Sequence, residues 1–162
     1  MGSLLLAAAA AMSVVSLSLP AHTLDGDAKT FPQDAEAPRS IFVVTFTKAA
    51  SEQGRAWTQR LGDLHERLTA PVFQVSVIED VPKMFRSSVI SGMGHSVPKE
   101  FHGRFWTAVS DSEKWKSVTA SASPKEASVI VVDRRGEIVW RGHGEVTDAK
   151  IEEIAGLPAP HL

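Results

Sequence analysis

One stretch, Ser128–Gly144 (SVIVVDRRGEIVWRGHG), limits the possible folds more than any other part of the chain. It opens with four consecutive apolar β-branched residues, from Val129 to Val132. A strand that does not alternate apolar and polar residues is buried on both faces, so we expect it in the middle of a sheet. A turn at Asp133–Gly136 and a second strand at Glu137–Arg141 follow, and they predict an antiparallel hairpin.

Strands and helices are expected to alternate through the rest of the chain. Apolar residues between Trp57 and Leu68 recur at helical spacing, and Thr147 and Gly156 are typical of a helix start and stop. Strands that alternate with helices imply parallel crossovers, so we predict a three-layer α/β fold with a central mixed sheet. The expected strands before the hairpin are Ser40–Thr47, Pro71–Ile78 and Arg104–Ser110, and the expected helices are Ala50–Leu68, Asp80–Gly94, Ser112–Ala120 and Thr147–Gly156.

The second of these helices is expected to begin with Asp80 as its cap and Pro82 in its first turn. It is expected to end at the glycines of Gly92-Met93-Gly94. Its apolar residues are expected to point into the core: Met84, Phe85, Val89 and Ile90. As an alternative, Met84, Phe85 and Met93 could form a pliable apolar groove that holds an apolar client.

The amino terminus has the pattern of an export signal. Residues 4–19 are apolar and uncharged, but they are too few for a membrane span of about 20 residues. We therefore expect a signal peptide over residues 1–21, cut after Ala21, with an uncleaved anchor or a buried helix as alternatives. An extended lead-in segment at 22–39, the folded domain at 40–157 and a tail at 158–162 would follow. The protein would then reach the periplasm or cell envelope, with membrane association only if the leader stays uncleaved.

The chain has no cysteine, which excludes thiol catalysis, disulfides, iron–sulfur clusters and cysteine-bound zinc. Its 17 basic and 19 acidic residues are scattered, so nucleic acid is not an expected partner. No nucleotide-binding loop is present either. We therefore expect no enzyme activity and no cofactor, and recognition of a protein client is the function that remains.

The strand, D-x-x-G turn, strand and helix at the end of the chain resemble the thioredoxin-like superfamily, in particular its peroxiredoxin and thiol-disulfide oxidoreductase branches. The resemblance implies reactive cysteines at Phe46–Glu52, where this chain has none. It also implies a cis-proline just before Ser128–Asp133, and the nearest proline, Pro124, is several residues too early. Both halves of the redox site of the superfamily are therefore expected to be absent.

A narrower similarity covers Ser40–Ile154. The string S-V-P-K-E at residues 96–100, Arg104-Phe105 and the later D-x-x-G-x-I-x-W resemble the "ATPase complex subunit ten" family of mitochondrial ATP synthase assembly factors. Those thioredoxin-like proteins act as chaperones during assembly of the membrane sector of the synthase. The resemblance implies a chaperone-like binding or assembly module that acts on a protein client.

The insert at Gly92–Arg104 is the expected partner surface, because aromatic and methionine side chains are common in adaptable protein interfaces. Ser51, with Lys48 as the nearby candidate base, is expected to cap a helix start or to form a surface pair rather than act as a nucleophile. The candidate partner-binding residues are Met93, His95, Val97, Phe101, His102 and Arg104.

The alternative function is a metal carrier or an enzyme that uses histidines. His95, His102 and His143 lie in predicted loops, and three imidazoles can bind zinc or copper. No H-x-x-x-H or H-E-x-x-H spacing supports such a site, so separate surface histidines are the favoured interpretation.

Overall fold

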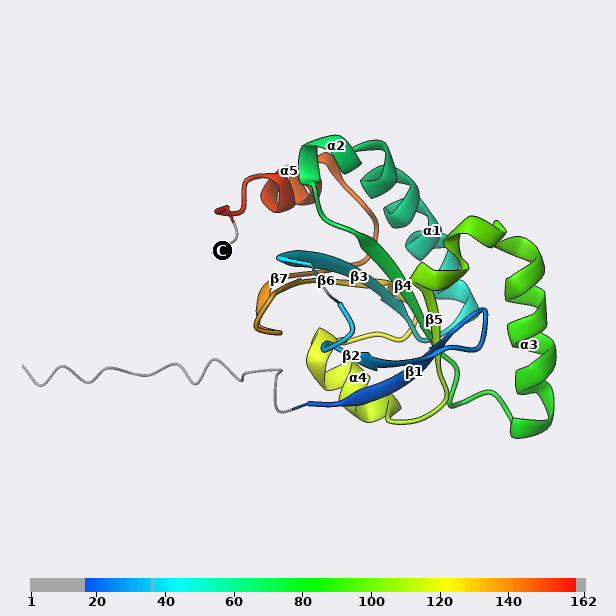
Figure 1. Cartoon of the computed structure of the whole chain (residues 1–162). Coiled ribbons are helices and arrows are strands. Elements are labelled where there is room, and N and C mark those ends of the chain that lie inside the picture. The colour runs from blue at the N-terminus through cyan, green and yellow to red at the C-terminus, as the bar shows by residue number, and fades with distance from the viewer. Residues whose placement is uncertain (1–16, 36, 160–162) are drawn as a thin grey trace, which may run out of the picture.

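A mixed sheet of seven strands, in the order β2-β1-β5-β4-β3-β6-β7, forms the middle layer of the computed structural model (Figure 1), which describes residues 17–35 and 37–159. Helices α1, α2 and α5 cover one face and α4 covers the other, so the predicted three-layer α/β fold is confirmed. The strands are β1 (Leu19–Thr23), β2 (Ala28–Phe31), β3 (Arg39–Thr45), β4 (Val72–Val77), β5 (Phe105–Ala108), β6 (Ser128–Asp133) and β7 (Ile138–His143). The helices are α1 (Lys48–Asp63), α2 (His65–Leu68), α3 (Lys83–Ser96), the 3-10 helix η2 (Lys99–Arg104), α4 (Ser112–Thr119) and α5 (Asp148–Ala155).

The hairpin β6–β7 forms as predicted. Strand β6 lies between β3 and β7 and is antiparallel to both, and its residues Ser128–Val132 are buried. In the turn, the carboxylate of Asp133 accepts hydrogen bonds from the backbone nitrogens of Arg135 and Glu137, both at 2.9 Å. Gly136 has a φ of 78°, a conformation that favours glycine. The turn residues therefore have the backbone role that their sequence indicates.

Helix α1 packs its buried residues Trp57 and Leu61 against β3 and β6, as the periodicity predicted. The predicted helix to Leu68 is divided instead, because the chain turns at Leu64 before α2 begins. Gly54 brings α1 unusually close to the sheet: a Cβ at this position would lie 2.9 Å from Cγ2 of Thr45.

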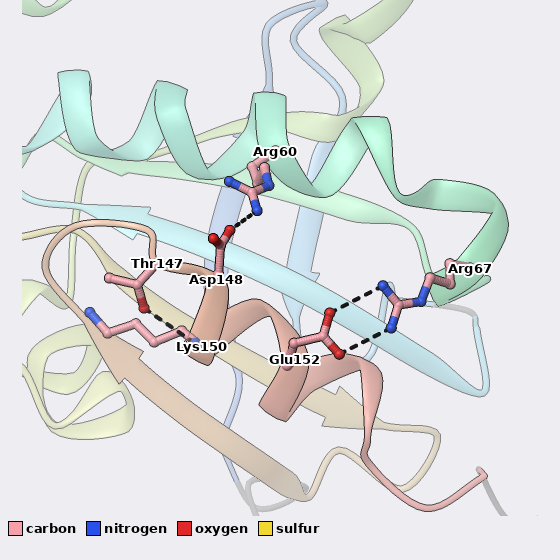
Figure 2. A network of polar contacts seen from close by, with 6 residues as sticks. All are labelled: Arg60, Arg67, Thr147, Asp148, Lys150 and Glu152. Carbon is pink, nitrogen blue, oxygen red and sulfur yellow. Dashed lines mark hydrogen bonds and ion pairs between the residues drawn. The ribbon is translucent and has the colours of Figure 1, made fainter.

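Helix α5 begins and ends where the sequence indicates. At its start, the side chain of Thr147 accepts a hydrogen bond from the backbone nitrogen of Lys150 at 3.2 Å, and Gly156 follows the last helical residue. Two ion pairs join α5 to α1 and α2: Arg60 with Asp148, and Arg67 with both oxygens of Glu152 (Figure 2). Both ion pairs are exposed to solvent, so each contributes little to the stability of the fold. The buried Ile151 and Ile154 supply the main packing.

Aromatic side chains fill the opposite face of the sheet, beneath α4. Phe42 of β3 contacts Phe31, Phe73 and Trp106, with ring centroids 4.9–5.5 Å apart, and Phe31 also contacts Trp115. Trp57, Trp106 and Trp115 are fully buried, and Trp140 is partly buried. The tryptophans therefore serve the core rather than a partner surface.

The predicted lead-in segment at residues 22–39 is wrong in part, because it contains most of an antiparallel hairpin. Strand β1 pairs with β2 and with β5, so the sheet extends by two strands at this edge. Leu19 and Phe31 are fully buried in the aromatic core, and Ala21 is 2% exposed. Cleavage after Ala21 would cut β1 and remove part of the core, so this boundary conflicts with the folded domain. The rest of the expected leader, residues 1–16, lies outside the described residues.

Helix α3 differs most from its prediction. It begins after Pro82 without a side-chain cap, so Asp80 is not the cap, and it continues through Gly92 and Gly94 to Ser96. None of its residues is buried. Met84 and Phe85, expected to face the core, are 78% and 54% exposed. Val89 and Ile90 are only partly buried. In Figure 1, α3 stands at the side of the domain instead of lying flat on the sheet.

Candidate functional site

The start of α1, where the superfamily resemblance would place reactive thiols, carries the hydroxyl groups of Thr47 and Ser51. Oγ1 of Thr47 accepts a hydrogen bond from the backbone nitrogen of Ala50 at 3.2 Å and donates one to the carbonyl of Pro124 at 2.7 Å. Oγ of Ser51 donates to the carbonyl of Thr47 at 3.2 Å. Thr47 is therefore the cap of α1 and connects the helix to the loop before β6. Ser51 donates back within the first turn, so it is not the cap that the sequence predicted.

A second region, the α3–η2 arm (residues 83–104), exposes most of the large apolar side chains on the described surface. Met84, Phe85 and Phe101 are 78%, 54% and 51% exposed, and the other two such residues, Val109 and Val139, are 37% and 39% exposed. Single exposed apolar residues are common on protein surfaces, but large apolar side chains that gather on one segment are typical of an interaction site. The arm is therefore the candidate site of interaction.

The six residues predicted to bind a partner all lie on this arm, but their surroundings differ. His95, Phe101 and Arg104 are exposed. The remaining three, Met93, Val97 and His102, are partly buried. The exposed group is available to a partner without rearrangement of the domain.

His102 has a role inside the domain. Its Nε2 lies 2.8 Å from the carbonyl oxygen of Val97, and its Nδ1 lies 3.3 Å from Oδ1 of Asp25 in the β1–β2 turn. The backbone carbonyl of His102 also accepts a hydrogen bond from the nitrogen of Leu24 at 3.3 Å. These contacts attach η2 to the β1–β2 hairpin, so His102 positions the arm.

The three histidines considered as metal ligands do not come together. His102 lies beside β1 and β5, whereas His143 belongs to β7, on the other side of β4, β3 and β6 in the sheet. Nε2 of His143 lies 2.6 Å from the carbonyl oxygen of Thr119. Within residues 17–35 and 37–159, no three histidine or acidic side chains are grouped as metal ligands would be.

The sequence allowed two places for Met84 and Phe85, the core or an apolar groove with Met93, and favoured the core because apolar residues in a helix normally indicate a buried face. The structure leaves both side chains exposed. The sequence signal for this exposure is the composition of α3, which contains two glycines and four serines and whose apolar residues do not form a compact stripe.

Among the described residues, no helix has the length and apolar character needed to cross a membrane.

No protein-family model matches the chain, and no curated protein matches it in sequence. Solved structures do match in fold. The exposed lipoprotein thioredoxin Etrx1 from Streptococcus pneumoniae aligns with a TM-score of 0.57 at 14% identity, over 86% of this chain and 99% of its own. StoA from Bacillus subtilis aligns with a TM-score of 0.53 at 13% identity, over 85% and 95%. BsSco, of the Sco family of cytochrome c oxidase assembly proteins, aligns with a TM-score of 0.51 at 11% identity, over 87% and 93%. The fold is therefore thioredoxin-like.

Proposed function

We propose that this cysteine-free thioredoxin-like domain is a chaperone-like binding or assembly module that holds a protein client on its α3–η2 arm. The observation that carries the proposal is the exposure of Met84, Phe85 and Phe101 on one projecting arm. The chain has no thiol, and the hydroxyl group of Thr47 caps the helix start where the superfamily resemblance would place one. Binding is the function that such a scaffold can still perform.

The proposal includes export to the periplasm or cell envelope. The apolar leader supports it, and so does the name of one similar structure, an exposed lipoprotein. The name of another, a protein of a cytochrome c oxidase assembly family, supports an assembly role. A relation to the ATP synthase assembly factors rests on the S-V-P-K-E string and the D-x-x-G-x-I-x-W motif alone. The client is therefore proposed as a protein that is assembled in the envelope.

Replacement of Phe101 tests the proposal most directly. Phe101 is half exposed, so Phe101→Asp adds a charge at the surface and should leave the thermal transition within about 2 °C of wild type. Interface aromatic residues carry a large share of binding energy, so crosslinked capture of the client from its native envelope should fall at least about tenfold. Mass spectrometry of the captured protein would identify the client.

Val139→Asp is the matched control, because Val139 is 39% exposed on β7, away from the arm. It should leave capture unchanged. Equal capture by wild type and Phe101→Asp would contradict the proposed site. A lowered unfolding temperature for Phe101→Asp would show that Phe101 belongs to the core.

A further inference from the structure

We infer that the α3–η2 arm recognises a protein segment in which acidic residues lie next to apolar ones. The inference rests on the proposed function and specifies the chemistry of the client. It combines three properties of the arm: an uncovered helix, ends that are fastened to the domain, and an excess of basic side chains.

Helix α3 lacks the packing that normally holds a helix of its length. It has 14 residues, of which none is buried and six are glycine or serine, both poor helix formers. Helices this short are marginal in water unless an apolar face is packed. A partner that covers Met84, Phe85 and the half-buried Val89 would supply the packing that the domain does not.

Both ends of the arm are nevertheless held in place. At the start of α3, Arg86 donates from Nε to the carbonyl of Val81 at 2.9 Å and from a terminal nitrogen to the carbonyl of Glu79 at 2.8 Å. At the other end, the side chain of His102 contacts Asp25, and its carbonyl accepts a hydrogen bond from the nitrogen of Leu24, so η2 is attached to the β1–β2 turn. The apolar side chains are thus presented on a backbone that is already positioned, which lowers the entropic cost of binding.

The arm is basic, although the whole chain is not. Residues 83–104 contain four lysines or arginines and one acidic residue, Glu100, which leaves 13 basic and 18 acidic residues in the rest of the chain. Lys83, Lys99 and Arg104 are exposed, and none of them takes part in an ion pair with another described residue. Three cations are therefore available to a partner.

Charge complementarity selects the class of partner. Two copies of the arm would repel each other, whereas acidic side chains beside an apolar segment would pair with Lys83, Lys99 and Arg104 while Phe85 and Phe101 are covered. Each exposed pair contributes a factor of about 1.5 to 5 in affinity, so the three together should contribute roughly tenfold.

A selection experiment tests the inference without knowledge of the client. A random 16-residue peptide display library is selected on the immobilised full chain, on Lys83→Glu/Lys99→Glu/Arg104→Glu, and on Phe101→Asp. Wild type should enrich peptides that combine Asp or Glu with large apolar residues. A synthetic copy of a wild-type-selected peptide should bind about tenfold more weakly to the triple variant. Its binding to wild type should weaken as NaCl is raised from 0.05 to 0.5 M.

The control triple variant Lys125→Glu/Arg134→Glu/Arg135→Glu makes the same charge change at exposed positions outside the arm and should select the same peptides as wild type. If wild type enriches apolar peptides without acidic residues and Phe101→Asp does not, the inference of an acidic partner is wrong, and the proposed function still stands. Peptides selected equally by wild type and Phe101→Asp would contradict the proposed function itself. The inference is also wrong if no peptide is enriched and wild type binds phosphatidylglycerol vesicles that the Lys83→Glu/Lys99→Glu/Arg104→Glu variant does not bind. The partner of the arm would then be a lipid surface.

Discussion

The close approach of α1 to β3 at Gly54 leads to a prediction that runs against helix propensity. In most helix interiors, Gly→Ala stabilises a protein by about 0.5–1 kcal/mol, because alanine has less backbone freedom to lose on folding. At Gly54, however, the new methyl group would lie 2.9 Å from Cγ2 of Thr45 and 3.6 Å from a methyl group of Val43. Thr45 is β-branched and lies on a buried strand, so Cγ2 has little freedom to move.

The cost of such overpacking is about 1–3 kcal/mol, which exceeds the gain in propensity. We therefore expect Gly54→Ala to lower the free energy of unfolding by about 1–2 kcal/mol, measured as a shift of the urea midpoint at constant slope. Gly62→Ala is the control in the same helix, because nothing lies within 4 Å of the Cβ that it would add. That variant should be more stable than wild type by about 0.5–1 kcal/mol.

The cause can be isolated with Thr45→Ser, which removes the methyl group that the new side chain would meet. Gly54→Ala should be much less harmful in the Thr45→Ser background, with a coupling energy of about 1–2 kcal/mol between the two sites. If Gly54→Ala stabilises the protein as much as Gly62→Ala does, or if the two substitutions are additive, the close contact is not what requires glycine at this position.

Three further predictions follow from the site. Thr47→Val removes both the cap of α1 and the hydrogen bond to Pro124, so it should lower the free energy of unfolding in urea by about 1–3 kcal/mol. Thr58→Val is the control, because it loses one intrahelical bond and should change that free energy by less than about 0.5 kcal/mol. The backbone nitrogen of Ser112 donates to the Glu79 carboxylate at 2.6 Å and lowers its pKa. The contribution of this bond to the free energy of unfolding should be present above the ordinary glutamate pKa of about 4.3 and be lost as the pH falls below it. Glu79→Gln should therefore make the melting temperature less dependent on pH in this acidic range, and an unchanged pH dependence would refute the role of this bond. The purified protein should show no activity above background in insulin-reduction assays, and it should contain no stoichiometric transition metal. One bound metal ion per chain that is lost in His95→Ala would favour the histidine alternative.

The elements that sequence predicts well here are those whose signals are local. The run from Val129 to Val132 indicates a strand buried on both faces, and Thr147 and Gly156 mark the ends of α5, because caps and side-chain periodicity act over a few residues. The β1–β2 hairpin was missed for a related reason. Leu19 to Thr23 alternates buried and exposed residues, but this short pattern overlaps an apolar leader that has its own interpretation.

The location of the candidate site in the chain could be predicted, but its composition could not. Phe101 and Arg104 were expected at the surface and are exposed there. For Met84 and Phe85 the core is the favoured prediction and an apolar groove the alternative, since the sequence of α3 does not show whether another layer covers its apolar residues. Nothing in the sequence connects Asp25 with His102, because the two residues meet only through the folding of the β1–β2 turn.

By itself, then, the sequence of this protein determined the order of most strands and helices, the hairpin at its end and the absence of thiol chemistry. These depend on residue type and on contacts within a few positions. The tertiary structure alone decided which apolar residues stay uncovered. Burial depends on segments that are distant in the chain, and none of the segments that the structure describes covers α3, so Met84 and Phe85 remain exposed.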